Sequence, residues 1–149
     1  MNDYGHWLFP YDIDVGKWFG FIYRITNKTN GKMYLGKKQF FSVNKKKIVG
    51  RKNRKTIKKE TKWREYAGSS QYLNDDIELF GKDNFKFEIL SLHETKASWS
   101  YREIEIQILE DVLRSKLNNG ELKYYNRQIG NAVKFIPPML TEKEREFLI

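Results

Sequence analysis

Two tyrosines lie eleven residues apart in an aromatic stretch near the start of the chain. Tyr23 ends the triplet Phe21-Ile22-Tyr23, and Tyr34 begins the triplet Tyr34-Leu35-Gly36, which Lys37 follows directly. A phenol with an ordinary pKa of about 10 is a weak base in water, and a nearby metal ion or a Lys or Arg side chain must lower that pKa before it can accept a proton readily. The pattern therefore suits phenols that act on a reacting water, and it also fits two phenols that only pack in a core.

A group of polar side chains lies on one predicted helix further along the chain. Glu103, Glu105 and Glu110 are its carboxylates, and Gln107 follows Glu103 by four residues, so these two side chains share a face. One carboxylate suits Mg²⁺, which keeps most of its waters and accepts few protein ligands. The spacing from Ser100 to Glu103 is also typical of a capping box, in which the glutamate bonds a backbone N–H. In that case Glu105 is the next candidate for the metal ligand.

The composition limits which metal sites the chain can form. There is no cysteine, and the two histidines, His6 and His93, are far apart in the sequence. A thiolate zinc site, a disulfide framework and a histidine-rich site are therefore excluded, and any metal must be held by oxygen ligands. Neither a targeting leader nor a long apolar run is evident, so we expect a cytoplasmic protein with no membrane partner.

Positive charge is concentrated in residues 37–64. The chain has a net charge of +9, and this segment holds 13 of its 28 Lys and Arg residues but only one of its 19 acidic residues, leaving 15 basic and 18 acidic residues elsewhere. Such a concentration is typical of a surface that binds a polyanion, because each cation placed on a phosphate releases counterions. A solvated charged tail is the alternative, although interspersed apolar residues favour an anchored loop or ribbon. The predicted DNA-binding residues are Lys37, Lys38, Lys45, Lys46, Lys47, Arg51, Lys52, Lys55, Lys58, Lys59, Arg64 and, on the helix, Gln107.

Three strands must position the tyrosines. Residues 18–36 contain two aromatic and β-branched runs around Asn30-Gly31, which predicts a hairpin closed by a type I′ turn. Residues 85–91 alternate apolar and polar side chains, as a third strand would. The expected fold is α+β, with a small three-stranded antiparallel sheet flanked by helices and a basic loop inserted after the second strand.

Two helices should accompany this sheet. The first follows Ser69 or Ser70 as its N-cap and ends at Gly81. The second starts at Lys96 or Tyr101 and runs to Leu117. Its predicted inner face carries Ile106, Leu109 and Leu113, with Asn119-Gly120 as the stop.

The rest of the chain shows no repeat and no linker. We expect a single domain over residues 1–149, with its core at about 19–127, the basic loop at about 37–64 and a tail at about 136–149 that forms one or two helical turns.

Several short motifs, taken in order, resemble the GIY-YIG family of nucleases. They are FIY, YLG, a helix opening with GSS, a strand ending in EIL, a helix with an early glutamate in SYREIEIQ, and YYN. The resemblance covers about residues 19–127, and it is closest to the stand-alone phage-encoded members through GRKNRK and KWREYAGSS. A tyrosine-rich hairpin alone would be ordinary core, but the joint order and spacing are specific.

The resemblance implies a role for each motif residue. Tyr23 would be the general base, Tyr34 would orient water or phosphate, and Glu103 would be the metal ligand. Asn126, which could equally form a turn, would position phosphate or water. The implied cofactor is Mg²⁺ or Mn²⁺.

The chain departs from the family pattern at three places. Phe21 replaces the first glycine and Leu35 replaces an isoleucine, and neither change removes a polar group. The catalytic arginine of better-known members follows the second motif on a helix, where this chain has its basic segment. We favour Arg54, from its distance to the GSS helix, and keep Arg51 and Arg64 as alternatives.

Together these features predict a divalent-metal-dependent endonuclease that hydrolyses DNA phosphodiester bonds. It would act as a monomer or a transient dimer on DNA, in the host cell cytoplasm if a phage encodes it. The alternatives are a non-catalytic basic nucleic-acid-binding protein and a nuclease fold that has lost activity.

Overall fold

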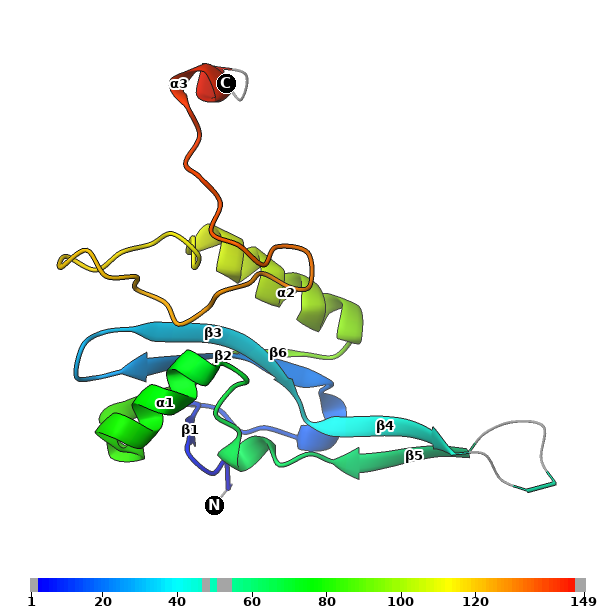
Figure 1. The fold of residues 1–149 in the computed structure, drawn as a ribbon. Helices are drawn as coiled ribbons and strands as arrows, with labels where there is room; N and C mark the ends of the chain where they lie inside the picture. The colour runs from blue at the N-terminus through cyan, green and yellow to red at the C-terminus, as the bar shows by residue number, and fades with distance from the viewer. Residues whose placement is uncertain (1–2, 47–48, 51–54, 147–149) are drawn as a thin grey trace.

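A mixed four-stranded sheet forms the centre of the computed structural model, which describes residues 3–46, 49–50 and 55–146, with helices on both faces (Figure 1). The strand order is β1-β6-β2-β3, in which β1 and β6 are parallel and the other neighbours are antiparallel. The strands are β1 (Trp7–Leu8), β2 (Gly20–Asn27), β3 (Met33–Gln39) and β6 (Phe85–His93).

The predicted three-stranded antiparallel sheet is therefore wrong in its number of strands and in its direction. Strands β2, β3 and β6 are the three expected ones, and β1 adds a parallel partner to β6. β1 is two residues long and shows no alternation to detect. Its place depends on Trp7, which is buried against Phe21 and Phe87 and donates its indole N–H to the Trp63 carbonyl at 2.6 Å.

The tyrosine hairpin is confirmed, but its turn is not of type I′. The φ of Asn30 is not positive, whereas the φ of Gly31 is +81°. A type I′ turn needs positive φ at both positions. β2 instead ends at Asn27, whose carbonyl accepts the Gly31 N–H at 2.8 Å across a longer loop. The Asn27 side chain accepts the Thr29 N–H and donates to the Tyr125 hydroxyl, which holds this loop in place.

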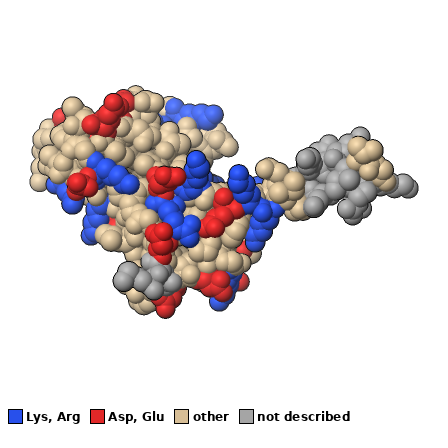
Figure 2. Space-filling view, turned by 90° about the horizontal axis from the view of Figure 1, so that it is seen from below, with Lys and Arg blue, Asp and Glu red and all other residues tan. Residues whose placement is uncertain are grey.

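The basic segment forms a second, two-stranded sheet from β4 (Phe41–Lys46) and β5 (Lys55–Glu60). Six residue pairs make a ribbon of roughly 20 Å. Phe40 and Trp63 are fully buried at its base, so the ribbon is anchored in the core. Figure 2 shows it projecting from the body, with Lys and Arg side chains where it leaves.

Two helices cover opposite faces of the sheet (Figure 1). α1 (Gln71–Phe80) begins at its N-cap Ser70, which accepts the Leu73 N–H, and ends at Gly81 as predicted. α2 (Lys96–Leu109) is shorter than expected. The chain turns at Asp111, where φ is +48°, and this turn lets Val112 and Leu113 pack against Leu35 of β3.

The predicted inner face of α2 was wrong at Leu109, and Leu113, although buried, lies after the end of the helix. Leu109 is 72% exposed, whereas Trp99 and Gln107 are buried. Trp99, Glu103 and Gln107 are spaced by four residues, so this row faces the sheet.

The remaining elements are short. After α2 the chain returns along β3, where Met33 pairs with Tyr124 in a parallel bridge, and then leads to the short terminal helix α3 (Glu142–Glu146). No helix of the described residues is long and apolar enough to span a membrane. The other elements are η1 (Val15–Lys17), η2 (Trp63–Glu65) and η3 (Lys82–Asn84).

Candidate active site

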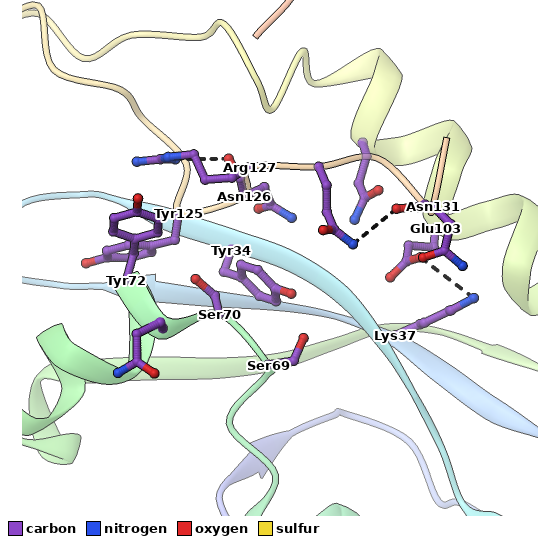
Figure 3. Close-up of a pocket in the computed structure, with 14 residues that line it drawn as sticks. Tyr34, Lys37, Ser69, Ser70, Tyr72, Glu103, Tyr125, Asn126, Arg127 and Asn131 are labelled. Carbon is purple, nitrogen blue, oxygen red and sulfur yellow. Dashed lines mark hydrogen bonds and ion pairs between the residues drawn. The ribbon is translucent and has the colours of Figure 1, made fainter. Parts of the chain in front are cut away.

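A cavity of about 400 Å³ opens beside the edge strand β3. Its walls come from β3, the start of α1, α2 and residues 125–131 (Figure 3). Five predicted site residues meet here from three separate parts of the chain: Tyr34, Lys37, Glu103, Gln107 and Asn126.

Glu103 is the carboxylate of this cavity. Its side chain is 14% exposed, and Lys37 Nζ lies 3.8 Å from its Oε1. Lys37 also donates to the Ser100 hydroxyl at 3.3 Å and lies 4.3 Å from the Trp99 ring centre, so its position is fixed from three sides. Burial raises the pKa of Glu103 above its ordinary value, and Lys37 opposes that shift.

The capping alternative for Glu103 is wrong. α2 begins at Lys96, and its N-cap is Thr95, whose hydroxyl accepts the Ser98 N–H at 3.1 Å. Ser100 therefore lies within the helix, and Glu103 points into the cavity rather than back to a free N–H.

Glu105, on the same helix, and Glu110, at its C-cap, point away from the cavity. Glu105 forms an ion pair with Arg102, and Glu110 accepts a hydrogen bond from the Tyr124 hydroxyl at 3.4 Å. Neither lines the cavity.

Two buried amides hold the strand edge beside the cavity. The Asn126 amide accepts the Leu35 N–H at 3.1 Å and donates to the Leu35 carbonyl at 2.8 Å. Gln107 Nε2 donates to the same carbonyl at 3.0 Å. Gln107 is 4% exposed, and its Oε1 has no hydrogen-bond partner among the described residues. Such a buried orphan acceptor calls for a ligand or water.

The cavity fits a hard cation with few protein ligands. Within the described residues no three His, Cys, Asp or Glu side chains lie close enough together to hold a metal ion. Glu103 and the orphan oxygen of Gln107 are the oxygen donors on the α2 wall. A set with one carboxylate matches Mg²⁺, which retains waters and binds substrate phosphate as well.

The two tyrosines lie one behind the other as seen from the cavity. Tyr34 lines the cavity, whereas Tyr23 is 1% exposed and lies behind it, with 6.1 Å between the ring centres. Burial raises the pKa of Tyr23 well above 10, and the neighbouring Tyr34 and Tyr66 raise it further. Burial also raises the pKa of Tyr34, while hydrogen bonds from Ser69 and Tyr23 lower it. A cation would have to offset this burial before either phenol could lose its proton readily.

The glycine of the second motif gives room for these phenols. A Cβ on Gly36 would lie 2.5 Å from the Tyr23 hydroxyl oxygen and 3.0 Å from Tyr34 Cε1. Gly68, with φ +82°, is packed against the same two rings. Two glycines, which have no side chain, therefore pack against the tyrosine pair.

Of the predicted cations whose side chains are described, only Lys37 lines the cavity. Arg64 bonds Glu60 at 2.8 Å and the Asp3 carbonyl at 2.9 Å, in a separate pocket. Lys38 lies over the Tyr66 ring, and Lys58 and Lys59 are exposed on β5. The remaining predicted cations lie outside the described residues or have side chains outside them: Lys45, Lys46, Lys47, Arg51, Lys52, Arg54 and Lys55.

The cavity also contains residues that the sequence did not single out as site residues. Arg127 directly follows the YYN motif, and Tyr72 lies in the first turn of α1. The position of Arg127 beside a motif asparagine was the available signal, but the meeting of these two residues depends on how residues 125–131 fold back.

Comparison with known proteins gives one match. The family model described as "Putative endonuclease segE, GIY-YIG domain" matches residues 7–129. No curated protein and no solved structure gave a significant match.

Proposed function

Because most of its length matches that model, the chain belongs to the GIY-YIG endonuclease family, and we propose that it is a divalent-metal-dependent endonuclease that hydrolyses DNA phosphodiester bonds. The observation that carries this proposal is the cavity in which Glu103, Lys37 and Tyr34 meet. Pure nucleic-acid binding needs the basic ribbon, but it does not need a mostly buried carboxylate beside a lysine and a phenol.

Each of these side chains has a task in the proposed reaction. A water attacks phosphorus and gives its proton to a phenolate oxygen. The new P–O bond forms as the bond to the leaving oxygen breaks, and that oxygen takes up a proton from solvent water. Lys37 places positive charge beside the phosphoryl oxygens, where negative charge grows in the transition state. Glu103, with Gln107, would hold the metal ion. When bound, the ion neutralises charge on the phosphoryl and leaving oxygens.

One of the two phenols faces the reacting water. Tyr34 lines the cavity and is therefore the phenol that can touch the water, and as a phenolate it accepts the proton that the water loses. The Tyr23 hydroxyl, to which the family resemblance assigns the general base, is buried behind Tyr34, and burial keeps it protonated by raising its pKa. Its hydrogen bond lowers the pKa of Tyr34, so Tyr23 acts by stabilising the Tyr34 phenolate.

Cleavage of supercoiled plasmid tests the proposal. We expect nicked or linear product with Mg²⁺ or Mn²⁺ and none with a chelator. Glu103→Gln keeps the side-chain volume but removes the charged ligand, which should lower the rate by about 10³-fold if the metal contributes about 4 kcal/mol to the transition state. Glu105→Gln is the matched control on the same helix and should cleave normally, because its carboxylate pairs with Arg102 outside the cavity.

Two outcomes would overturn the proposal. DNA binding without cleavage under every divalent metal would indicate a non-catalytic protein or an inactive nuclease fold. Loss of cleavage in Glu105→Gln but not in Glu103→Gln would move the metal to the other glutamate.

A further inference from the structure

Arg127 lies at the other end of the cavity from Glu103 and Lys37 (Figure 3). Its Nη1 donates to the Tyr124 carbonyl at 2.7 Å and to the Asn126 carbonyl at 2.9 Å. Its guanidinium carbon lies 4.7 Å from the centre of the Tyr72 ring. The guanidinium is therefore held in place through one of its three nitrogens and through the ring.

The rest of that guanidinium has no protein partner within the described ranges. No described carboxylate lies within 4.0 Å of it, and no described acceptor bonds its Nε or Nη2. Three N–H donors thus remain in the planar arrangement that binds a phosphate through two oxygens. Four other described arginines each pair with an acidic side chain: Arg24, Arg64, Arg102 and Arg114.

Other features of the cavity support a ligand at this end. Tyr72 is 58% exposed, and with Ser70 it belongs to the start of α1, where the helix dipole favours an anion. Gln107, which also lines this cavity, has a buried side-chain oxygen with no partner among the described residues, as expected beside a site that a ligand or water completes. Its volume of about 400 Å³ is in the range of pockets that hold a ligand of many atoms.

We propose that Arg127 and Tyr72 form a second phosphate subsite, which binds the DNA phosphate next to the one that is cleaved. This inference rests on the proposed function, which puts the cleaved phosphate at Glu103, Lys37 and Tyr34. Arg127 is then a positioning residue, because it fixes the strand through a phosphate that does not react. It supplies a cation on the cavity wall that does not depend on the basic segment.

DNA binding in the presence of a chelator tests the subsite without any cleavage. The dissociation constant of a fluorescent 30-base-pair duplex is measured between 50 and 200 mM salt for wild type and Arg127→Gln. We expect about tenfold weaker binding and a salt slope shallower by about 0.9, which is the loss of one charge-assisted phosphate contact. Lys82→Gln is the control, since it removes one exposed cation outside the cavity and should change neither quantity as much.

Two further variants keep the test decisive. Arg127→Lys keeps the charge but cannot bind through two donors in a plane, so its affinity should lie between wild type and Arg127→Gln. If the Arg127 variants melt early because the bonds to Tyr124 and Asn126 are lost, Tyr72→Ala tests the same subsite from an exposed position. It should weaken binding several-fold at an unchanged melting temperature.

A change in the DNA locates the contact. A neutral methylphosphonate at the phosphate next to the cut should weaken binding by wild type, and it should add little to the defect of Arg127→Gln. Additive losses, or an unchanged salt slope in Arg127→Gln, would overturn the subsite. A wild type that never cleaves but shows the slope change would refute the proposed function and leave a phosphate site at Arg127.

Discussion

Replacement of Gly36 by alanine should displace the two phenols of the proposed active site with a single methyl group. The new Cβ would lie 2.5 Å from the Tyr23 hydroxyl oxygen and 2.7 Å from its Cζ. Ordinary van der Waals contact begins at 3.4 Å, so the hydroxyl must move by about 0.9 Å. Tyr23 is 1% exposed and packs against the rings of Tyr34 and Tyr66, so its hydroxyl can move only by displacing its neighbours.

The displacement has a cost in stability and in rate. Overpacking of a dense core costs about 1 to 3 kcal/mol, which lowers the melting temperature by roughly 3 to 12 °C in a chain of this size. Misplacement of a catalytic group by about 1 Å costs about 10²-fold in rate. Gly36→Ala should therefore fold, melt earlier and nick plasmid about a hundred times more slowly under conditions in which both proteins are folded.

A matched glycine gives the control. A Cβ on Gly16 would meet only the Asp14 carboxylate, at 3.6 Å, so Gly16→Ala should cleave and melt like wild type. Adding Tyr23→Phe to Gly36→Ala removes the nearest contact but leaves the Cζ contact, and it should restore part of the melting temperature. If Gly36→Ala melts and cleaves as wild type does, the close packing of Gly36 on the phenols has no catalytic importance.

Three further predictions concern the phenols, acid stability and the basic ribbon. Tyr34→Phe should cut at least about 10²-fold more slowly at nearly unchanged stability. Tyr23→Phe should also lose activity while costing about 1 kcal/mol in urea unfolding, and full activity in either variant removes that phenol from the proposed reaction. Burial and then Lys82 lower the pKa of His6 from 6.5 to about 4, so the unfolded chain takes up the proton first as pH falls, and stability should decline between those values. Urea unfolding at several pH values should show a smaller decline for His6→Gln, and an equal decline would assign it to other groups. Lys58→Gln with Lys59→Gln should make the salt slope of DNA binding shallower by about 1.8 and weaken all duplex sequences alike, whereas an unchanged slope would mean that the ribbon does not touch phosphate.

The elements that local pattern specifies could be predicted from the sequence. β6 alternates apolar and polar side chains, and β2 and β3 are aromatic and β-branched runs on either side of Asn30-Gly31. α1 has a capping serine at one end and a glycine at the other. The meeting of Tyr34, Glu103 and Asn126 could be predicted as well, but through the resemblance to a family rather than through periodicity.

The elements that depend on distant contacts could not be predicted from the sequence. Two-residue β1 exists because β6 offers a free edge, and the end of α2 is fixed by the burial of Val112 and Leu113 against β3. Gln107 was predicted to contact metal or phosphate because it shares a helix face with Glu103, and it does line the same cavity. Its burial and its hydrogen bond to a backbone carbonyl of β3 depend on another element, and no pattern within its own helix reveals them.

The way in which the edge of β3 is hydrogen-bonded explains why there is a cavity beside it. Edge strands present unpaired N–H and C=O groups, which a neighbouring strand would normally cover. Residues 123–125 begin such a pairing at Met33, and two residues later the Asn126 and Gln107 side chains bond the Leu35 backbone in place of a strand. Because side chains satisfy the edge there, the chain after Asn126 is free to move away from β3. The space that opens between them holds Glu103 at one end and Arg127 at the other. Asn126→Ala should therefore impair cleavage through the shape of the cavity even if its amide never contacts DNA.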